Sequence, residues 1–177
     1  LAGLAAAAGE SIPATFVRIT RETRGMALFS FAFLNQRMDA VEAMLEHPRM
    51  LVGLGDSGAH VGQIMDASLP SWLLAYWVRD RGKLTIEEAV RRMTSDTAAV
   101  FGVHNRGVLT PGAYADVNVL DLDALTLGLP EYVHDFPGGA GRFVQRATGF
   151  RQTLVNGQVF VENGEPTGRH AGVTLRA

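Results

Sequence analysis

One stretch constrains the fold of this chain more than any other: an apolar run, residues 50–54, that ends in Gly55-Asp56-Ser57-Gly58. The run has the length and composition of a buried strand, and the glycines after it require a turn. This order places Asp56 just beyond the C-terminal end of a strand, where α/β barrels carry their active sites. A carboxylate there can ligate a metal ion or take a proton from a metal-held water. Asp56 can equally cap the following turn or helix, and the spacing leaves both roles open.

The residues after Asp56 offer further candidates for chemistry. His60 follows four positions later, and it could bind substrate, orient Asp56 or fill a structural polar role. Gly-Asp-Ser-Gly also resembles serine-protease nucleophile motifs, but the flanking helices and the missing triad context argue against Ser57 as a nucleophile. The next polar residues fit either a pocket mouth or a solvated loop: Gln63, Asp66 and Ser68. The aromatic residues at helical spacing favour packing: Trp72, Tyr76 and Trp77.

Strand-like and helix-like segments alternate over the first hundred residues, which is typical of βα units in a barrel or a doubly wound sheet. The patterns predict a helix over 1–9, a strand or extended segment over 12–20, a buried strand over 26–34 and a helix over 35–47. They then predict the strand over 50–54 and an apolar helix that ends at Val78. A capping box formed by Thr85 and Glu88 starts the next helix. A second short helix follows and ends at Gly102.

From residue 103 onward the composition shifts to Gly, Pro and short β-type runs. Residues 116–121 alternate as a strand does, and residues 152–161 surround Asn156-Gly157, a strong hairpin signal. Between them, residues 130–149 are rich in Gly and Pro and predict a loop. We therefore expect two domains, 1–103 and 104–177.

Composition excludes several classes of function. The chain has 177 residues, a net charge of −2 and no cysteine, so it offers neither a basic surface for nucleic acid nor a thiolate ligand or nucleophile. No apolar run approaches the roughly 20 residues of a membrane span. The alanine-rich start lacks a basic leader and an initiating Met, and it predicts the tail of a longer helix in a fragment. We expect a cytoplasmic protein that binds neither nucleic acid nor membrane.

Several short motifs occur in order along the chain, and together they resemble the C-terminal part of an amidohydrolase-superfamily enzyme. The branch they resemble is the D-aminoacylases, or N-acyl-D-amino-acid deacylases. The resemblance covers about residues 33–161 and rests on these motifs: Gly53 to His60, Leu84 to Val90, Met93-Thr94, Phe101-Gly102, Arg106 to Gly112, Ala115-Asp116 and Val155 to Gly157.

The resemblance implies a fold of class α/β plus β: the last βα units of a metal-dependent (β/α)8 barrel, then C-terminal strands of a small β-sandwich. It implies that Asp56 touches a zinc centre and carries a proton to the leaving amine. His60 is a substrate-binding candidate by its position near Asp56. The family's His-x-His pair and its other metal ligands have no counterpart in this sequence. Residues 57–78 contain no Arg that could grip a substrate carboxylate, so the resemblance leaves D-selectivity open.

The resemblance thus implies a zinc-dependent amidohydrolase that cleaves N-acyl (D-)amino acids or a related small amide. We expect this chain alone to be inactive, because one Asp cannot supply the roughly three protein ligands of a catalytic zinc. The alternative is a non-catalytic subdomain or subunit that acts by completing a barrel with another chain. In both cases we expect the chain to associate with itself or with a missing N-terminal part.

Overall fold

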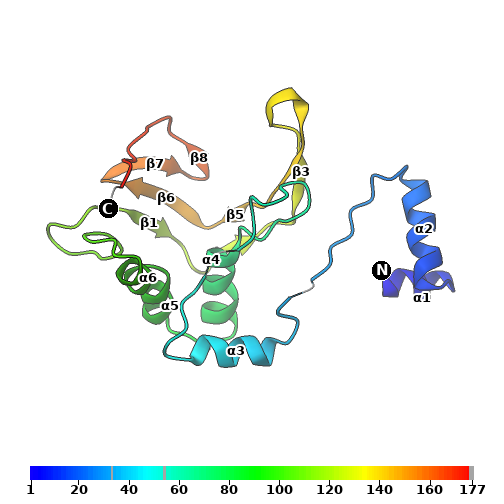
Figure 1. Ribbon diagram of the computed structural model, residues 1–177, viewed down its shortest axis with the longest axis horizontal. Coiled ribbons are helices and arrows are strands. Elements are labelled where there is room, and N and C mark those ends of the chain that lie inside the picture. Colours follow the sequence, from blue (N-terminus) through cyan, green and yellow to red (C-terminus); the bar gives the residue numbers. More distant parts are fainter. Residues whose placement is uncertain (33, 54, 176–177) are drawn as a thin grey trace. The chain divides into compact units, whose positions relative to one another are not determined.

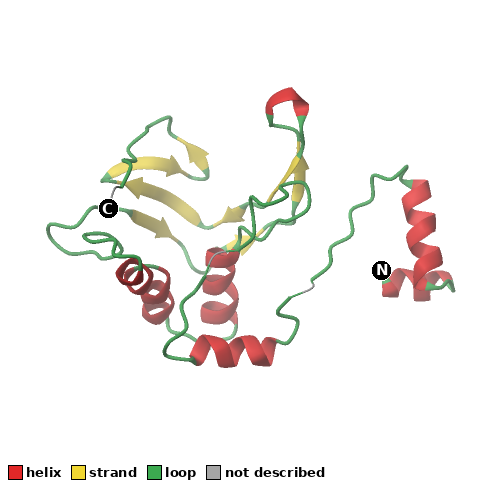
Figure 2. Cartoon of the chain, in the orientation of Figure 1, coloured by secondary structure: helices red, strands yellow, loops and turns green. Residues whose placement is uncertain are grey.

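The computed structural model describes residues 1–32, 34–53 and 55–175, with helices in the first part and antiparallel strands in the second (Figures 1 and 2). The helices are α1 (Ala2–Ala8), α2 (Ile12–Glu22), α3 (Met38–Glu46), α4 (Leu69–Trp72), the π-helix η1 (Leu73–Asp80), α5 (Ile86–Met93), α6 (Ser95–Val100) and the 3-10 helix η2 (Pro137–Gly139). The strands are β1 (Val117–Leu120), β2 (Thr126–Leu127), β3 (Glu131–Val133), β4 (Arg142–Val144), β5 (Ala147–Thr148), β6 (Phe150–Val155), β7 (Gln158–Glu162) and β8 (Glu165–Pro166).

The chain forms two compact units, Leu1–Ala43 and Met44–Ala177. Every strand pair among the described residues is antiparallel, and these residues form no closed barrel. The helical and the antiparallel parts of the predicted fold class are therefore present. The domain boundary between residues 103 and 104 stays a prediction.

The first unit contains α1 and α2, and the extended segment predicted for residues 12–20 is wrong. Those residues lie in α2, where the Ser11 hydroxyl oxygen accepts a hydrogen bond of 3.3 Å from the Ala14 N–H and Pro13 lies in the first turn. This is the usual start of a helix, since Ser satisfies a free N–H and Pro needs none. The predicted α1 is confirmed, and Gly9 ends it with φ 65°.

The strand predicted over residues 26–34 is also wrong for the described residues, and Phe33 lies outside them. Residues 26–32 form no strand, and apolar side chains there face solvent: Met26 is 76% and Phe31 79% exposed. A strand needs a neighbour to receive its backbone hydrogen bonds. No described segment pairs with these residues, so the apolar run stays extended and uncovered.

The helix predicted before Pro48 is confirmed as α3, but the strand predicted over residues 50–54 is absent from the described residues of that run, 50–53. Leu54 lies outside the described residues. The Met50 N–H donates to the His47 carbonyl at 3.0 Å, which closes a turn after α3. Residues 51–53 then run without a strand partner, so their sequence preference for β structure has no ladder to join.

The core of the second unit forms around η1. Trp77 is 1% exposed and lies among other buried apolar side chains, namely Leu73, Leu74, Ala75, Leu84, Ala89 and Leu125. Trp72 stacks on Tyr76 with 4.8 Å between ring centroids, and Trp77 meets both rings edge-on. The aromatic residues therefore pack, as predicted. Arg79 extends from the end of η1 and donates to the carbonyl of Leu122 at 3.1 Å.

The start of α5 confirms one half of the predicted capping box. The Thr85 hydroxyl accepts a 3.1 Å hydrogen bond from the Glu88 N–H. The Glu88 carboxylate does not return to Thr85; it forms an ion pair with Arg92, whose side chain is 7% exposed. Arg92 also donates to the Leu45 carbonyl. A buried cation thus joins α5 to the end of α3, which supplies the partners that burial of a charge requires.

The sheet of the second unit has the strand order β1-β6-β7-β8, seen side by side in Figure 1. The hairpin predicted around Asn156-Gly157 is confirmed: β6 and β7 pair, and both turn residues have positive φ, 49° and 78°. Such values match a type I′ turn, whose twist suits a two-residue hairpin. Within the sheet, β1 and β8 pair on one side only.

A polar network, the Arg106 network, fixes this hairpin to the preceding loop. It consists of Arg106, Asp116 and Asn156: Arg106 pairs with the Asp116 carboxylate and donates to Asn156 Oδ1 at 2.8 Å. Asp116 accepts a second hydrogen bond, of 2.8 Å, from the Asn156 N–H. The Arg106 guanidinium also lies 4.2 Å from the centroid of the Tyr114 ring. The network thus joins the loop before β1 to a turn that lies 40 to 50 positions later in the sequence.

The Arg106 network predicts a loss of stability in acid. Burial raises the pKa of Asp116, but the hydrogen bond from the Asn156 N–H and the ion pair with Arg106 outweigh burial, so the pKa is lowered overall. A lowered pKa stabilises the folded state above the unfolded pKa, and this contribution is lost as pH falls through the folded pKa. We expect the free energy of unfolding to fall more steeply below about pH 4 in the wild type than in Asp116→Asn.

Urea titrations across a pH series measure this difference. Asp123→Asn is the control, because the Asp123 carboxylate is exposed and lies outside the Arg106 network. Equal acid slopes for the wild type and Asp116→Asn would contradict the prediction.

Candidate functional site

The Asp56 loop, residues 55–66, closes on itself at its two ends. The Asp56 N–H donates to Asp66 Oδ2 at 2.7 Å. A Cβ on Gly55 would lie 2.7 Å from the Asp66 carbonyl oxygen and 2.8 Å from its Oδ2, so only glycine fits at that point. The two ends of the loop therefore meet where Gly55, which has no side chain, lies against Asp66. The Asp66 carboxylate accepts the hydrogen bond that holds them together.

The carboxylate of Asp56 is exposed and makes no hydrogen bond or ion pair with any residue that the structure describes. Its backbone, in contrast, is held on both sides, because the Asp56 carbonyl accepts from the Ala59 N–H at 3.1 Å. The predicted turn after the apolar run is present over residues 57–63. The loop thus fixes the main chain of Asp56 and leaves its side chain available.

His60 is exposed in the same loop, and its ring forms no hydrogen bond with the Asp56 carboxylate. Its own backbone has φ 51°, and its carbonyl accepts from the N–H groups of Gln63 and Ile64 at 2.7 and 3.1 Å. His60 therefore shapes the turn through its backbone. A role of its side chain in substrate binding stays a prediction.

Of the residues considered for a pocket mouth, Asp66 has a defined contact. Its carboxylate holds the Asp56 N–H, and so it supports the loop from within. This contact links two acidic residues that lie ten positions apart, and sequence spacing gave no signal for it.

The hairpin of β3 and β4 braces the Asp56 loop from a distant part of the sequence. The Phe143 N–H donates to the Val61 carbonyl at 2.9 Å, and the Tyr132 hydroxyl lies 3.6 Å from the place of a Cβ on Gly62. The loop predicted over residues 130–149 is therefore wrong, since it contains β3, η2, β4 and β5. Sequence reasoning missed this brace, although Glu131-Tyr132-Val133 and Arg142-Phe143-Val144 are short β-type runs on either side of Pro137.

Packing explains why the Gly-rich segment forms this hairpin. A Cβ on Gly141 would overlap the Tyr132 ring, so the ring occupies the space that a side chain would take. Tyr132 also meets Phe143 edge-on with 5.0 Å between ring centroids. Arg142 pairs with Asp135 at 2.6 Å, which lowers the pKa of that carboxyl through the hydrogen bond from Arg142. The glycines predicted as loop thus allow two short strands to approach.

The described residues do not fit a complete metal site. No group of three or more His, Asp or Glu side chains among them could hold a metal ion. Asp56 supplies one carboxylate, whereas a catalytic zinc takes about three protein ligands. Two other histidines make local hydrogen bonds: His47 Nδ1 accepts from the Arg49 N–H at 3.2 Å, and His134 Nδ1 lies 2.9 Å from the Gly139 carbonyl.

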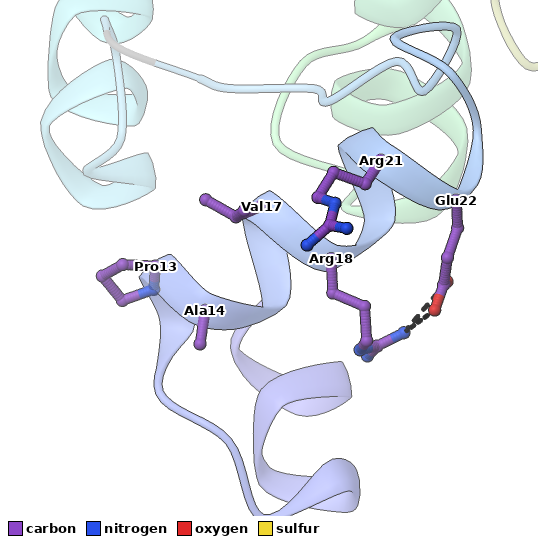
Figure 3. A pocket seen from close by; sticks show the side chains of 6 residues that line it. All are labelled: Pro13, Ala14, Val17, Arg18, Arg21 and Glu22. Carbon is purple, nitrogen blue, oxygen red and sulfur yellow. Dashed lines mark hydrogen bonds and ion pairs between the residues drawn. The ribbon is translucent and has the colours of Figure 1, made fainter.

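Two hollows lie outside the Asp56 loop. One, of about 750 Å³, lies along α2 and is lined by residues of that helix alone, as Figure 3 shows. Arg18 there is paired with Glu10 at 3.0 Å and with Glu22 at 3.1 Å. The other, of about 600 Å³, is lined by residues of α5, α6, β1 and β6 and of the loop between α6 and β1, which contributes Asp116 of the Arg106 network. Neither hollow is lined by Asp56 or His60.

No helix in the part of the chain that the structure describes has the length and hydropathy to cross a membrane.

Residues 1–161 match the profile of the amidohydrolase family. The chain therefore belongs to the amidohydrolase family, and the resemblance drawn from its motifs is confirmed. The branch resemblance is confirmed too, since the chain is 35% identical over 103 residues to the D-aminoacylase of Alcaligenes xylosoxydans xylosoxydans. It is also 35% identical over 104 residues to the N-acyl-D-glutamate deacylase of the same organism.

These matches cover 58% and 59% of this chain but only 19% and 20% of the two relatives. The chain thus spans about a fifth of the length of the curated relatives it matches. Among solved structures, the N-acyl-D-glutamate deacylase of Bordetella bronchiseptica, complexed with zinc and a phosphonate inhibitor, is 35% identical. That match has a TM-score of 0.41 and covers 54% of this chain and 19% of that one.

Proposed function

We propose that this chain contributes Asp56 to the active site of an enzyme that hydrolyses the amide bond of N-acyl amino acids. Membership of the amidohydrolase family and the identity to a D-aminoacylase and an N-acyl-D-glutamate deacylase support this class of reaction. The observation that carries the residue assignment is the geometry of the Asp56 loop. Its main chain is held by Asp66, while the Asp56 carboxylate has no partner among the described residues.

In this proposal Asp56 is the proton carrier. A carboxylate without a salt-bridge partner is free to take a proton from the attacking water and to deliver it to the leaving nitrogen. A carboxylate already paired with Arg would hold its charge and accept the proton less readily. The close approach of Gly55 to Asp66 and the hydrogen bond from the Asp56 N–H fix the main chain that carries Asp56. A fixed main chain helps proton transfer, because donor and acceptor must lie within hydrogen-bond reach.

We propose that the enzyme uses zinc, and that Asp56 is the one ligand drawn from this chain. The remaining ligands would come from sequence outside these 177 residues. A second candidate, a non-catalytic subunit, receives support from the incomplete donor set of the described residues. The two candidates differ in whether an enzyme containing this sequence depends on Asp56.

The experiment is a hydrolysis assay of the enzyme that contains this sequence, with paired N-acetyl-D and N-acetyl-L amino acids. The proposal expects release of the free amino acid, and its loss after treatment with a chelator. The 177-residue chain alone, with added Zn²⁺, should release none. Absence of hydrolysis by the longer enzyme on every acyl amino acid would reject the proposal, and the ratio of D to L rates would settle selectivity.

We further propose that the chain associates with itself or with the rest of the enzyme through its uncovered apolar residues. Exposed side chains cluster in one extended stretch of the first unit: Met26, Leu28, Phe29, Phe31 and Leu34. Apolar runs of this kind favour burial against another surface. We expect sedimentation of the purified chain at micromolar concentration to give species larger than a monomer. A monomer with a cooperative melt would count against association.

A further inference from the structure

The sheet contains two turns with the same sequence and nearly the same backbone. Asn156-Gly157 joins β6 to β7, and Asn163-Gly164 joins β7 to β8. The φ values are 49° and 78° in the first turn and 50° and 86° in the second. Local sequence and local conformation are therefore matched, and any difference in the chemistry of the two asparagines must come from their surroundings.

In the first turn, both atoms of the Asn156 side-chain amide and the Gly157 N–H form hydrogen bonds to residues outside the turn. Asn156 Oδ1 accepts from Arg106 at 2.8 Å, and Asn156 Nδ2 donates to the Ala171 carbonyl at 2.6 Å. The Gly157 N–H donates to the Ala115 carbonyl at 2.8 Å. The side-chain amide cannot turn towards the Gly157 nitrogen without breaking these bonds, and that nitrogen is itself engaged.

The second turn lacks these contacts. Asn163 is exposed, and its side-chain amide bonds to no residue that the structure describes. The Gly164 N–H likewise donates to none of them. Asn163 is held only through its backbone, since its N–H donates to the Arg151 carbonyl at 2.7 Å.

The strand beyond the second turn is also weakly held. β8 has two residues, pairs with Val161 and Glu162 of β7, and contains Pro166, which has no N–H to donate. The next residue adds contacts to β7: the Thr167 N–H donates to the Phe160 carbonyl at 2.9 Å, and its hydroxyl donates to the Val159 carbonyl at 2.7 Å. Edge elements with few backbone hydrogen bonds open locally at low free-energy cost. The β7–β8 turn can therefore leave its I′ geometry while the β6–β7 turn stays closed.

We propose that Asn163 is a site of spontaneous deamidation and that Asn156 is protected from it by the fold. Hydroxide removes the proton of the Gly164 amide, and the nitrogen then attacks Cγ of Asn163. A bond forms between the Gly164 nitrogen and Cγ, the bond from Cγ to Nδ2 breaks, and ammonia leaves with a proton from water. The resulting five-membered succinimide is opened by water at either carbonyl, giving aspartate or isoaspartate.

The product changes the edge of the sheet. A new carboxylate at position 163 lies between Glu162 and Glu165, and like charges so close repel one another. Isoaspartate also adds a carbon to the main chain, so the two-residue turn no longer matches the register of Glu162 with Glu165. We expect the modified chain to lose the pairing of β8 with β7.

The experiment follows both asparagines in the same molecule. The 177-residue chain is incubated at mildly alkaline pH, folded or in urea, and peptide mapping by mass spectrometry quantifies replacement of each amide by a carboxyl. In the folded chain we expect Asn163 to react about tenfold faster than Asn156 or more, because the two turns open with different free energies. In urea we expect the two rates to be similar, since both sites are then plain Asn-Gly.

The variant Arg106→Leu frees Asn156 Oδ1 and should raise the rate at Asn156 while leaving Asn163 unchanged. If this variant fails to fold, the comparison of folded and urea-treated wild type decides alone. Equal rates at the two sites in the folded chain would overturn the proposal. Protection of both sites, or a rate ratio in urea as large as that in the folded chain, would overturn it as well.

Discussion

Replacing Asp56 by Asn in the enzyme that contains this sequence will lower kcat by about a hundredfold or more, the usual size of a general acid–base contribution. The amide cannot take up the proton that a carboxylate accepts, and it is otherwise nearly the same size. The fold will remain, because the Asp56 side chain makes no hydrogen bond or ion pair with other described residues and its N–H still reaches Asp66 Oδ2. Steady-state kinetics and a thermal melt measure the two effects separately.

Asp66→Asn is the matched control in the same loop. The amide side chain introduced by this variant would keep an oxygen that accepts from the Asp56 N–H, so the loop geometry should persist and the activity loss should be far smaller. Near-wild-type turnover of Asp56→Asn would reject the role of Asp56. Equal losses in both variants would instead assign the effect to loop geometry, and the proton-carrier role would fall with it.

Replacing Gly149 by Ala will destabilise the second unit by about 2 kcal/mol or more. Gly149 precedes β6 with φ 91°, and a Cβ there would lie 2.7 Å from Cα and 2.8 Å from N of Leu125. Leu125 is fully buried, and the Gly149 carbonyl accepts from the Asp121 N–H at 2.8 Å. Two backbone segments would have to separate, and both the core and a backbone hydrogen bond would be disturbed.

The variant Gly112→Ala tests backbone strain in the absence of steric overlap. Gly112 has φ 90°, and no atom lies within 4 Å of its Cβ position, so this variant carries the conformational cost alone. Gly157→Ala is similar, with φ 78° and the nearest atom at 4.0 Å. Urea unfolding should rank Gly149→Ala as clearly less stable than these two. A loss at Gly149 no larger than that at Gly112 would show that the close approach to Leu125 contributes nothing.

Features set by neighbouring residues could be predicted from the sequence. The Thr85 cap, the stop at Gly9 and the hairpin turn at Asn156-Gly157 each depend on a few adjacent residues, and all three are present. The strands predicted over 26–34 and 50–54 are absent from the described residues of those runs, because a strand needs a partner and composition carries no information about one. In residues 12–20 the helix start at Ser11-Ile12-Pro13 prevails over the preference of the β-branched residues for a strand.

In the candidate site, too, the features set by neighbouring residues could be predicted, whereas those set by distant partners could not. Asp56 could be singled out from the glycines that follow an apolar run, because a turn there is a local event. Its support could not be predicted, since Asp66 and the β3–β4 hairpin reach the loop across ten and about eighty positions. The Gly-rich composition of residues 130–149 predicted a loop, whereas Gly141 serves to admit the Tyr132 ring.

The Arg106 network has a consequence for the order of folding. The β6–β7 hairpin is local and can close early, but Asn156 meets Asp116 and Arg106 across 40 and 50 positions. Closing loops of that length costs entropy before any contact offsets it, which slows folding. During synthesis Arg106 and Asp116 emerge from the ribosome well before Asn156. Arg106 and Asp116 therefore lack Asn156 until the hairpin forms, and β1, which pairs with β6, can join the sheet only at that late step.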